Sequence, residues 1–438
     1  MNKIIKTPNA LLGVFLCRFV IFASMYFIYN IIALGIQIFL SIVALFNKKM
    51  SLFIDGRKES FKKIEDVISS DDKTIWVHAA SLGEFEQGRP IIERLREKFS
   101  NHKIVLTFFS PSGYEVQKNF KEADVICYLP LDSRSNARKF IKTVHPEIAI
   151  FVKYEFWPNL LRELERKNIE TILVSGIFRK EQVFFKWFGS WMRQSLQSFS
   201  YFFVQNENSK QLLNTIGFDN VAVSGDTRFD RVYSIKEQNS QLDFMINFKQ
   251  DKTIFVAGSS WKEDESIIVD YINGSEQDYA KFVIAPHNIN TDEIKKLKES
   301  IHKETVLYSE LGNSAIEDAN VMIIDTIGLL TKIYKYADVA YVGGAFATGL
   351  HNVLEPATFG SAIIIGPNYN KFNEAVELVK LGGCMPVQNY TEFKEILNSL
   401  LSDPVLRTKK GKIAGDYIVN NTGATKMVFK YVINKIAL

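Results

Sequence analysis

Short apolar runs alternate with amphipathic stretches along most of this 438-residue chain, and this alternation restricts the fold more than any other feature. A stretch of helical period, such as residues 84–99, follows each apolar run of the first series. Strands that alternate with helices in this way form parallel sheets with crossover helices. The candidate strands form two series, at 74–80, 103–109, 125–128, 148–152, 171–175, 201–204 and 221–223, and then at 253–257, 281–285, 321–324, 339–342 and 362–365.

The two series predict two doubly wound α/β domains. A polar, helix-prone stretch at about 232–250 lacks a strong apolar face and is typical of an interdomain connection. We therefore expect an N-terminal Rossmann-like domain at 51–235, a C-terminal Rossmann-like domain at 245–415 and a C-terminal helix at 416–438. Ligands of such sheets bind beyond the carboxyl ends of the strands, so functional residues should directly follow strands and line a cleft between the domains.

The composition is that of a globular protein and argues against some partners. Hydrophobic residues make up 47% of the chain and charged residues 23%, which is typical of a folded protein. The net charge of +4 is small, and Lys and Arg form no stripe, which argues against nucleic acid as a partner. The three cysteines, Cys17, Cys127 and Cys384, match no metal-ligand or redox spacing, and we interpret them as packing residues.

An uncharged apolar run extends over residues 19–46. A helix needs roughly 20 apolar residues to cross a bilayer, so this run is long enough to span one. It is too long for the core of a signal peptide, and a buried core helix is the alternative. We therefore predict a membrane anchor at 1–50. More Lys and Arg residues follow the run than precede it, which favours a body on the cytoplasmic face of the membrane.

The sequence Ser-Leu-Gly-Glu at 81–84 stands between a predicted strand and a predicted helix. Its glycine permits a tight turn, and the Glu84 carboxylate would stand at the mouth of the predicted cleft. A hydroxyl group is a poor nucleophile at neutral pH, so a general base within hydrogen-bond reach, such as Glu84, would assist its attack. A helix N-terminus weakens the basicity of Glu84, whereas desolvation strengthens it. A plain helix-capping role is the alternative.

A glycine-bearing loop follows a strand of the second series, in the segment 342–360. Pro356 suits the first turn of a helix, and loops of this kind bring backbone N–H groups toward phosphate. His351, Asn352 and Glu355 cluster at the helix entrance, where an acid can accept hydrogen bonds from ribose hydroxyls. An ordinary loop with a helix cap is the alternative.

Shorter motifs also follow predicted strands. The segments 257–265, 285–287 and 325–330 are either nucleotide contacts or ordinary turns. Glu155 and Trp157 stand next to another strand end, where an aromatic ring beside an acid packs against a sugar or into the core. The six histidines are dispersed and no convincing acidic pair follows a strand, so we expect neither a metal nor another cofactor.

Together these motifs resemble the 3-deoxy-D-manno-octulosonic acid (Kdo) transferases of lipopolysaccharide biosynthesis. The matching segments stand in the order of that family and cover nearly the whole body of the chain. They lie at 76–90, 107–115, 128–132, 153–160, 175–179, 223–231, 256–265, 284–287, 325–346, 351–360 and 365–372. An N-terminal membrane anchor is also usual in the family.

The resemblance implies a glycosyltransferase of the GT-B type, which has two Rossmann-like domains and needs no metal. Such an enzyme transfers Kdo from CMP-Kdo to a lipid A precursor, of the tetraacyldisaccharide 4′-phosphate type, at the bacterial inner membrane and with inversion at the anomeric carbon. The family's proton acceptor falls on Glu84. The family's contacts to the nucleotide sugar fall on Pro286, His287, Ile327, Gly328, Leu329, Asn352, Val353, Leu354 and Glu355.

Three motifs depart from the usual family pattern. His287 stands where many members have an Arg that suits phosphate, and Leu329 stands where many have a Glu. In the glycine-bearing loop, Leu350 and Val353 replace a Gly and a Pro. Backbone contacts tolerate these changes, whereas the side-chain contacts of the missing Arg and Glu are lost.

Two other functions stay open on the sequence alone. One is a different membrane-associated GT-B glycosyltransferase that uses a UDP-sugar, and binding of CMP rather than UDP would separate it from a Kdo transferase. The other is a membrane-tethered protein that binds the nucleotide sugar without catalysing transfer.

Overall fold

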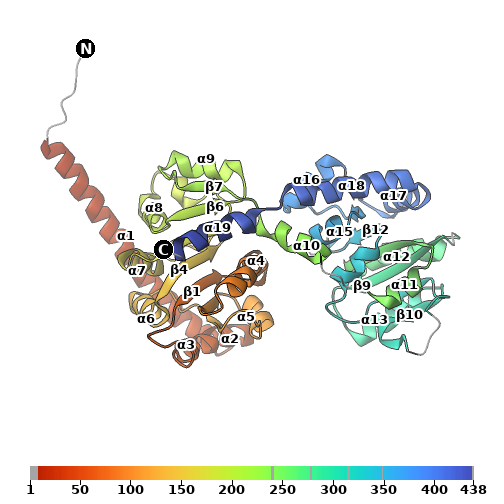
Figure 1. The fold of residues 1–438 in the computed structure, drawn as a ribbon, viewed down its shortest axis with the longest axis horizontal. Coiled ribbons are helices and arrows are strands. Elements are labelled where there is room, and N and C mark those ends of the chain that lie inside the picture. The colour runs from red at the N-terminus through yellow and green to blue at the C-terminus, as the bar shows by residue number, and fades with distance from the viewer. Residues whose placement is uncertain (1–7, 238–240, 277–278, 313–315, 348, 437–438) are drawn as a thin grey trace, which may run out of the picture. The chain divides into compact units, whose positions relative to one another are not determined.

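The structure, a computed structural model, describes residues 8–237, 241–276, 279–312, 316–347 and 349–436 (Figure 1). The chain forms two compact units. Unit 1 comprises Met1–Arg231 and Gly423–Leu438, and unit 2 comprises Val232–Thr422. Each unit contains a parallel sheet of seven strands, so the predicted α/β class is confirmed.

The sheet of unit 1 has the strand order β3-β2-β1-β4-β5-β6-β7. β1 therefore lies between β2 and β4, and the strand order reverses at this point. Because the paired strands are parallel, residues that follow β1 and β4 meet at the same edge of the sheet. The strands are β1 (Thr74–Ala79), β2 (Lys103–Phe108), β3 (Val125–Tyr128), β4 (Pro146–Val152), β5 (Glu170–Gly176), β6 (Tyr201–Val204) and β7 (Val221–Val223).

Both faces of this sheet are buried, which explains the continuous apolar runs in the sequence. Ile75 and Val77 of β1 pack into one core cluster, whereas Trp76 between them packs into the cluster on the opposite face. The helices of unit 1 that follow the apolar N-terminal helix are α2 (Lys48–Lys58), α3 (Ser60–Glu65), α4 (Leu82–Lys98), α5 (Pro111–Gln117), α6 (Arg134–Val144), α7 (Pro158–Arg166), α8 (Ser190–Gln197), α9 (Glu207–Thr215) and α19 (Ala424–Ile436), with a 3-10 turn η1 (Val183–Phe185).

The sheet of unit 2 has the strand order β10-β11-β9-β8-β12-β13-β14, and β8 lies between β9 and β12. The strands are β8 (Thr253–Ser260), β9 (Ala280–Pro286), β10 (Thr305–Leu307), β11 (Val321–Ile323), β12 (Val339–Val342), β13 (Ala362–Ile365) and β14 (Cys384–Pro386). The helices are α11 (Asp243–Lys249), α12 (Lys262–Gly274), α13 (Thr291–Ser300), α14 (Leu330–Ile333), α15 (Leu354–Thr358), α16 (Asn373–Leu381), α17 (Tyr390–Ser402) and α18 (Pro404–Asn420), with 3-10 turns η2 (Tyr308–Glu310) and η3 (Tyr334–Tyr336). Helix α10 (Thr227–Glu237) runs from unit 1 into unit 2.

Two helices share the segment 416–438, for which the sequence predicts a C-terminal helix. α18 belongs to unit 2, and α19 belongs to unit 1. Asp230 accepts hydrogen bonds from the backbone N–H groups of Gly423 at 2.6 Å and Thr425 at 2.7 Å, which fixes the start of α19. Val428 of α19 is fully buried in the core of unit 1. The end of the chain thus completes the first unit.

The N-terminal apolar run forms most of helix α1 (Pro8–Val43). Among the helices that the structure describes, α1 is the one with a stretch long and apolar enough to cross a membrane. This stretch is Met25–Val43, with a mean hydropathy of 2.0. The predicted apolar N-terminal helix is therefore present.

Candidate active site

The first candidate site lies at the carboxyl end of β1, where Ser81 and Glu84 begin α4. Ser81 has an extended backbone, with φ −139° and ψ 173°, and directly precedes the helix. Its backbone N–H donates to Glu84 Oε2 at 3.1 Å, as in a capping box. Glu84 therefore caps the helix, and the same contact holds its carboxylate at the edge of the sheet where ligands bind in this class of fold.

The environment of Glu84 makes its carboxylate a stronger base than an exposed glutamate. The residue is 7% exposed. Burial raises the pKa of Glu84 above its ordinary value, and the nearby Glu155 carboxylate raises it further, whereas His78 and Lys153 lower it. Burial and the Glu155 charge therefore outweigh the charges and the backbone hydrogen bond that lower this pKa.

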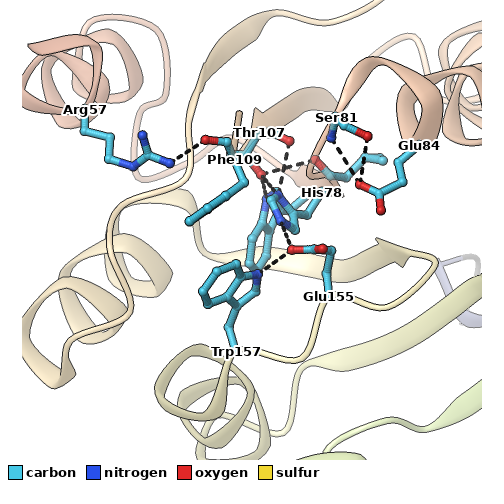
Figure 2. A network of polar contacts seen from close by, with 10 residues as sticks. Arg57, His78, Ser81, Glu84, Thr107, Phe109, Glu155 and Trp157 are labelled. Carbon is cyan, nitrogen blue, oxygen red and sulfur yellow. Dashed lines mark hydrogen bonds and ion pairs between the residues drawn. The ribbon is translucent and has the colours of Figure 1, made fainter. Parts of the chain in front are cut away.

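Glu155, which follows β4, is held near Glu84 by a network of polar contacts (Figure 2). Trp157 Nε1 donates to Glu155 Oε2 at 2.8 Å, and His78 Nε2 lies 3.3 Å from the same oxygen. On the other side of its ring, His78 Nδ1 lies 2.9 Å from Thr107 Oγ1. His78 is fully buried, and Thr107 is its partner across the β1–β2 pair. This network therefore fixes the position of the Glu155 carboxylate.

A buried cation on α2 supports the same region. The Arg57 Nη2 group donates to Phe109 O at 2.5 Å (Figure 2). The guanidinium also lies 3.5 Å from the centroid of the Phe53 ring. Phe109 in turn packs on Trp157, with ring centroids 4.7 Å apart. Burial lowers the pKa of Arg57 to about 9. The helix that follows the apolar N-terminal helix is thus linked by contact to the loop that carries Glu155.

The second candidate site lies at the carboxyl ends of β8 and β12 in unit 2. Asp264 is 1% exposed and accepts three hydrogen bonds. The donors are the backbone N–H groups of Trp261 at 2.9 Å and Gly344 at 2.8 Å, and the hydroxyl of Tyr341 at 2.6 Å. Gly344 has φ +94°, and a Cβ there would lie 2.3 Å from Gly349 O, so the loop requires glycine. Asp264 thereby ties the glycine-bearing loop to the start of α12.

Three rings stack beside this loop. Trp261 Nε1 donates to His351 Nε2 at 2.9 Å. The His287 ring lies 4.7 Å from the Trp261 ring and 4.4 Å from the His351 ring, between centroids, and stacks on both. Burial, and then His287, lower the pKa of His351 to about 4. His351 Nε2 accepts a hydrogen bond from the indole N–H, so in the neutral ring the proton is on Nδ1. This Nδ1–H group can donate a hydrogen bond to a ligand.

The fold brings the three predicted nucleotide-binding segments, 286–287, 327–329 and 352–355, to one edge of the sheet in unit 2, because β11, β9, β8 and β12 are consecutive neighbours. Contacts link them further. The stack joins the segment after β9 to the loop after β12, and Thr331 Oγ1 donates to Glu355 Oε2 at 2.8 Å, which joins α14 to α15.

Individual residues of these segments differ in what they can offer a ligand. Asn352 Nδ2 donates to Glu355 Oε1 at 3.1 Å, so a residue of the same loop orients the Glu355 carboxylate. Val353 and Leu354 are buried, which leaves only their main chain for a ligand. By contrast, Ile327 is 87% exposed. Two further residues complete the predicted set: Gly328 has φ +94°, and Leu329 directly precedes α14. Among the described residues, no group of three or more His, Cys, Asp or Glu side chains could hold a metal ion.

The roles of His78, Trp261 and Asp264 were not predicted. His78 stands inside a buried strand, and its contacts depend on the register between strands. Asp264 stands three residues after Trp261, as Glu84 stands three residues after Ser81. That capping spacing was the available signal for Asp264, within a motif that was interpreted only as a nucleotide contact or a turn.

Comparison with known proteins identifies the class. The family described as 3-deoxy-D-manno-octulosonic-acid transferase (kdotransferase) matches residues 55–231. A 3-deoxy-D-manno-octulosonic acid transferase from Aquifex aeolicus is 28% identical over 371 residues, which cover 82% of this chain and 94% of the relative. A bifunctional glycosyltransferase/methyltransferase from Fusobacterium nucleatum is 27% identical over 366 residues, which cover 81% of this chain and 56% of that longer relative.

Among solved structures, a UDP-GlcNAc 2-epimerase from Neisseria meningitidis, bound to UDP-GlcNAc, is similar with a TM-score of 0.57 and 18% identity, covering 83% of this chain and all of that chain. At this identity the similarity shows the fold alone. The two sheets and the sequence relatives together define a glycosyltransferase of the GT-B fold. Within that class, the chain is similar to Kdo transferases, through the family match over residues 55–231 and through relatives that cover about 80% of its length.

Proposed function

We propose that the protein transfers Kdo from CMP-Kdo to a lipid A precursor of the tetraacyldisaccharide 4′-phosphate type, with inversion at the anomeric carbon and without a metal. The family and its Kdo transferase members support the transferred sugar and a place in lipopolysaccharide synthesis. The mechanism rests on one observation. Glu84 is a buried carboxylate at the carboxyl end of β1, and burial and Glu155 raise its pKa.

In the proposed reaction, Glu84 acts as the general base. Its carboxylate takes the proton of the attacking sugar hydroxyl as that oxygen forms a bond to the anomeric carbon of Kdo. The bond between this carbon and the phosphate oxygen breaks on the opposite face, which inverts the configuration and releases CMP. A raised pKa favours this role because a base works best when its pKa approaches the working pH. Glu155 contributes the negative charge that sustains the shift.

In the same proposal, unit 2 binds CMP-Kdo. Glu355 accepts hydrogen bonds from the ribose hydroxyls, and Asn352 and Thr331 orient its two oxygens. His287 and the Nδ1–H group of His351 donate to the anionic groups of the donor, in place of the Arg that many family members carry. Pro286, Ile327, Gly328, Leu329, Val353 and Leu354 contribute through main-chain atoms or contact with the base.

We place the reaction at the cytoplasmic face of the bacterial inner membrane. The apolar stretch Met25–Val43 supports contact with a bilayer. A lipid acceptor also requires it, because the acyl chains of a lipid A precursor stay in the membrane while its sugar is modified. The excess of Lys and Arg after the apolar run favours the cytoplasmic side.

The test is Glu84→Gln, which keeps the shape of the side chain and removes the base. We expect CMP binding to be unchanged and the transfer rate to fall by roughly 10²–10⁴-fold, the range typical of a lost general base. Transfer is measured as the mass increase of a lipid A precursor incubated with CMP-Kdo.

Glu93→Gln is the matched control, because Glu93 lies on the same helix in a surface pair with Arg89 at 2.7 Å. This variant should keep the full rate. Near-normal transfer by Glu84→Gln would remove Glu84 from the proposed role, while leaving the family assignment intact.

A further inference from the structure

Helix α1 packs on unit 1 along one side only, in the part whose side chains are described. Buried or half-buried positions lie at intervals of three, four and seven residues, the spacing of one helix side, at Tyr26, Tyr29, Ala33, Leu40 and Val43. The opposite side is apolar and exposed, between 45% and 63% at each position. This free face contains Phe27, Ile28, Ile31, Leu34, Ile38 and Ile42.

The contacts with unit 1 extend along the helix. Near its start, the Tyr26 hydroxyl hydrogen-bonds to the Asn159 side chain, and the Tyr29 hydroxyl donates to Asp132 Oδ2 at 2.7 Å. Further along, Ser41 lines a cavity of about 260 Å³ together with Arg57 of α2. Fifteen residues separate the first and last of these contacts, which is roughly 22 Å of helix.

Such contacts are incompatible with a helix that crosses the bilayer over this stretch. The guanidinium groups of Arg134 and Arg162, both exposed, lie 4.7 and 4.8 Å from the Tyr26 ring. At the other end, the exposed Lys58 lines the same cavity as Ser41. A bilayer core is roughly 30 Å thick, so a crossing helix would carry the body and its charges into hydrocarbon. A helix parallel to the membrane surface keeps them in water.

A second apolar element lies beside this helix, between η1 and α8. Trp187 is 91% exposed and Phe188 is 53% exposed. Their loop is firmly held, because Arg193 Nε donates to Phe184 O at 2.5 Å and its Nη2 donates to Lys186 O at 2.9 Å. A Cβ on Gly189 would lie 1.6 Å from the carbonyl oxygen of residue 183, so the turn depends on glycine. Rigid aromatic rings exposed in this way are typical of the lipid headgroup region.

The two elements are continuous through α8, which Figure 1 shows beside α1. Trp191 of α8 packs on Tyr29 of α1, with ring centroids 6.1 Å apart. Lys186 adjoins Trp187 in sequence, and Lys180 and Arg179 are exposed on the preceding loop. Apolar rings and an apolar helix face with cations at their margin match a bilayer that contains anionic lipid.

We propose that the free face of α1 and the Trp187–Phe188 loop form one surface that lies in the plane of an anionic bilayer, at the level of the headgroups. This refines the proposed membrane location and is independent of the chemistry assigned to Glu84. Residues 26–43 of α1 then lie between the membrane and the rest of unit 1. The Trp187–Phe188 loop provides a second membrane contact, and the two contacts together hold unit 1 in a fixed orientation.

The test measures the depth of single fluorescent labels on the full-length chain in vesicles of phosphatidylglycerol and phosphatidylethanolamine. Labels are attached at Ile28→Cys, Ile42→Cys and Trp187→Cys. Val405→Cys is the control, because Val405 is a 78% exposed apolar residue of unit 2. Every sample also carries Cys17→Ser. The native Cys127 and Cys384 are buried, and burial raises the pKa of the Cys127 thiol to about 12, so they do not label.

Nitroxide-bearing lipids then quench the labels, with the nitroxide placed either near the headgroup or deep in the acyl chains. We expect severalfold stronger quenching at 28, 42 and 187 than at 405, and the shallow nitroxide should be more effective at all three. Different depths at 28 and 42 would show a crossing helix, and quenching at 187 as weak as at 405 would remove the loop from the surface. Shielding of 187 that needs only concentrated protein and no vesicles would assign the surface to a second copy. Each of these results overturns the proposal, and a transfer assay on the same samples tests the proposed function separately.

Discussion

The two units place an acid at the same position and use it in different ways. In unit 1, Glu84 is the third residue after Ser81 at the end of β1, and in unit 2, Asp264 is the third residue after Trp261 at the end of β8. Each caps its helix, and burial raises the pKa of both acids. Asp264, however, accepts from two donors outside the start of its own helix, Tyr341 and Gly344, whereas the hydrogen bonds described for Glu84 come from the neighbouring Ser81 and Ala80. The same local motif therefore places a carboxylate that holds the glycine-bearing loop in unit 2, and a carboxylate that is available to a substrate in unit 1.

Position in the fold alone therefore does not determine the chemistry of these two sites. Both sheets reverse their strand order at the first strand, which creates the ligand-binding edge. The two edges differ in the loops beside them. In unit 1 the neighbouring loop carries Glu155 and its hydrogen-bond donor Trp157, and in unit 2 it is the glycine-bearing loop with the ring stack. Function thus depends on the loops placed on the fold.

The largest expected effects come from replacing each of the two acids in turn. Asp264→Ala leaves two backbone N–H groups and a tyrosine hydroxyl without their acceptor, and we expect a loss of about 3 kcal/mol in the free energy of unfolding, since each such group costs roughly 1–3 kcal/mol. The loss is measured as a lower urea midpoint. CMP binding should weaken with it because the glycine-bearing loop is released.

Glu84→Gln should act in the opposite direction on stability. Folding raises the pKa of Glu84, so the ionised carboxylate destabilises the fold above the ordinary pKa of glutamate. We expect this variant to have a higher urea midpoint than the native chain at pH 7, and the difference to vanish at acid pH. If instead Asp264→Ala unfolds like the native chain, the contrast between the two acids is wrong.

The next effect concerns pH and the acid beside Glu84. Glu155→Gln removes a negative charge that raises the pKa of Glu84, so that pKa falls. A base must be ionised to act, so transfer rises with pH through the pKa of Glu84. We therefore expect the acid limb of the rate–pH profile to shift to lower pH in this variant.

The matched control lies on the same strand. Glu147 stands near the amino end of β4, in an ion pair with Lys73 at 3.4 Å, whereas Glu155 follows the carboxyl end of that strand. Glu147→Gln should leave the acid limb in place. A shift to higher pH in Glu155→Gln would mean that this acid does not act on Glu84 through its charge.

Much of the fold follows from the sequence for a simple physical reason. A parallel strand covered on both faces requires a continuous apolar run, so twelve of the fourteen described strands were predicted, including the edge strands β3 and β7. β10 and β14 were missed, because each has only three residues and neither Thr305–Leu307 nor Cys384–Pro386 is a continuous aliphatic run. The returning helix α19 could not be assigned to unit 1, because its partner Asp230 lies far away in the sequence.

The sites were predictable only where the signal is local. Glu84 stands in a strand–turn–helix motif, and the sequence located it correctly at the end of β1. His78 was missed because its contacts with Thr107 and Glu155 come from two other parts of the sheet. The bond between Trp261 and His351 likewise joins residues 90 positions apart, and only the closed loop after β12 brings them together.

The smallest expected effect tests that bond. Trp261→Phe keeps a ring for the stack with His287 but removes the indole N–H that fixes the tautomer of His351. The neutral form of His351 loses one hydrogen bond, so its pKa should rise from about 4 toward the ordinary value for histidine. Loss of one such bond costs about 1 kcal/mol, which corresponds to roughly fivefold weaker CMP binding.

Calorimetric titration with CMP measures the binding, and NMR titration of the imidazole measures the pKa of His351. Trp187→Phe is the control, since it removes the same group from an exposed ring in unit 1 and should leave both values unchanged. A lower affinity with an unchanged His351 titration would mean that Trp261 contacts the nucleotide itself. If affinity and titration both stay at the native values, the ring stack is packing alone, and unit 2 recognises its ligand through the loop that Asp264 holds.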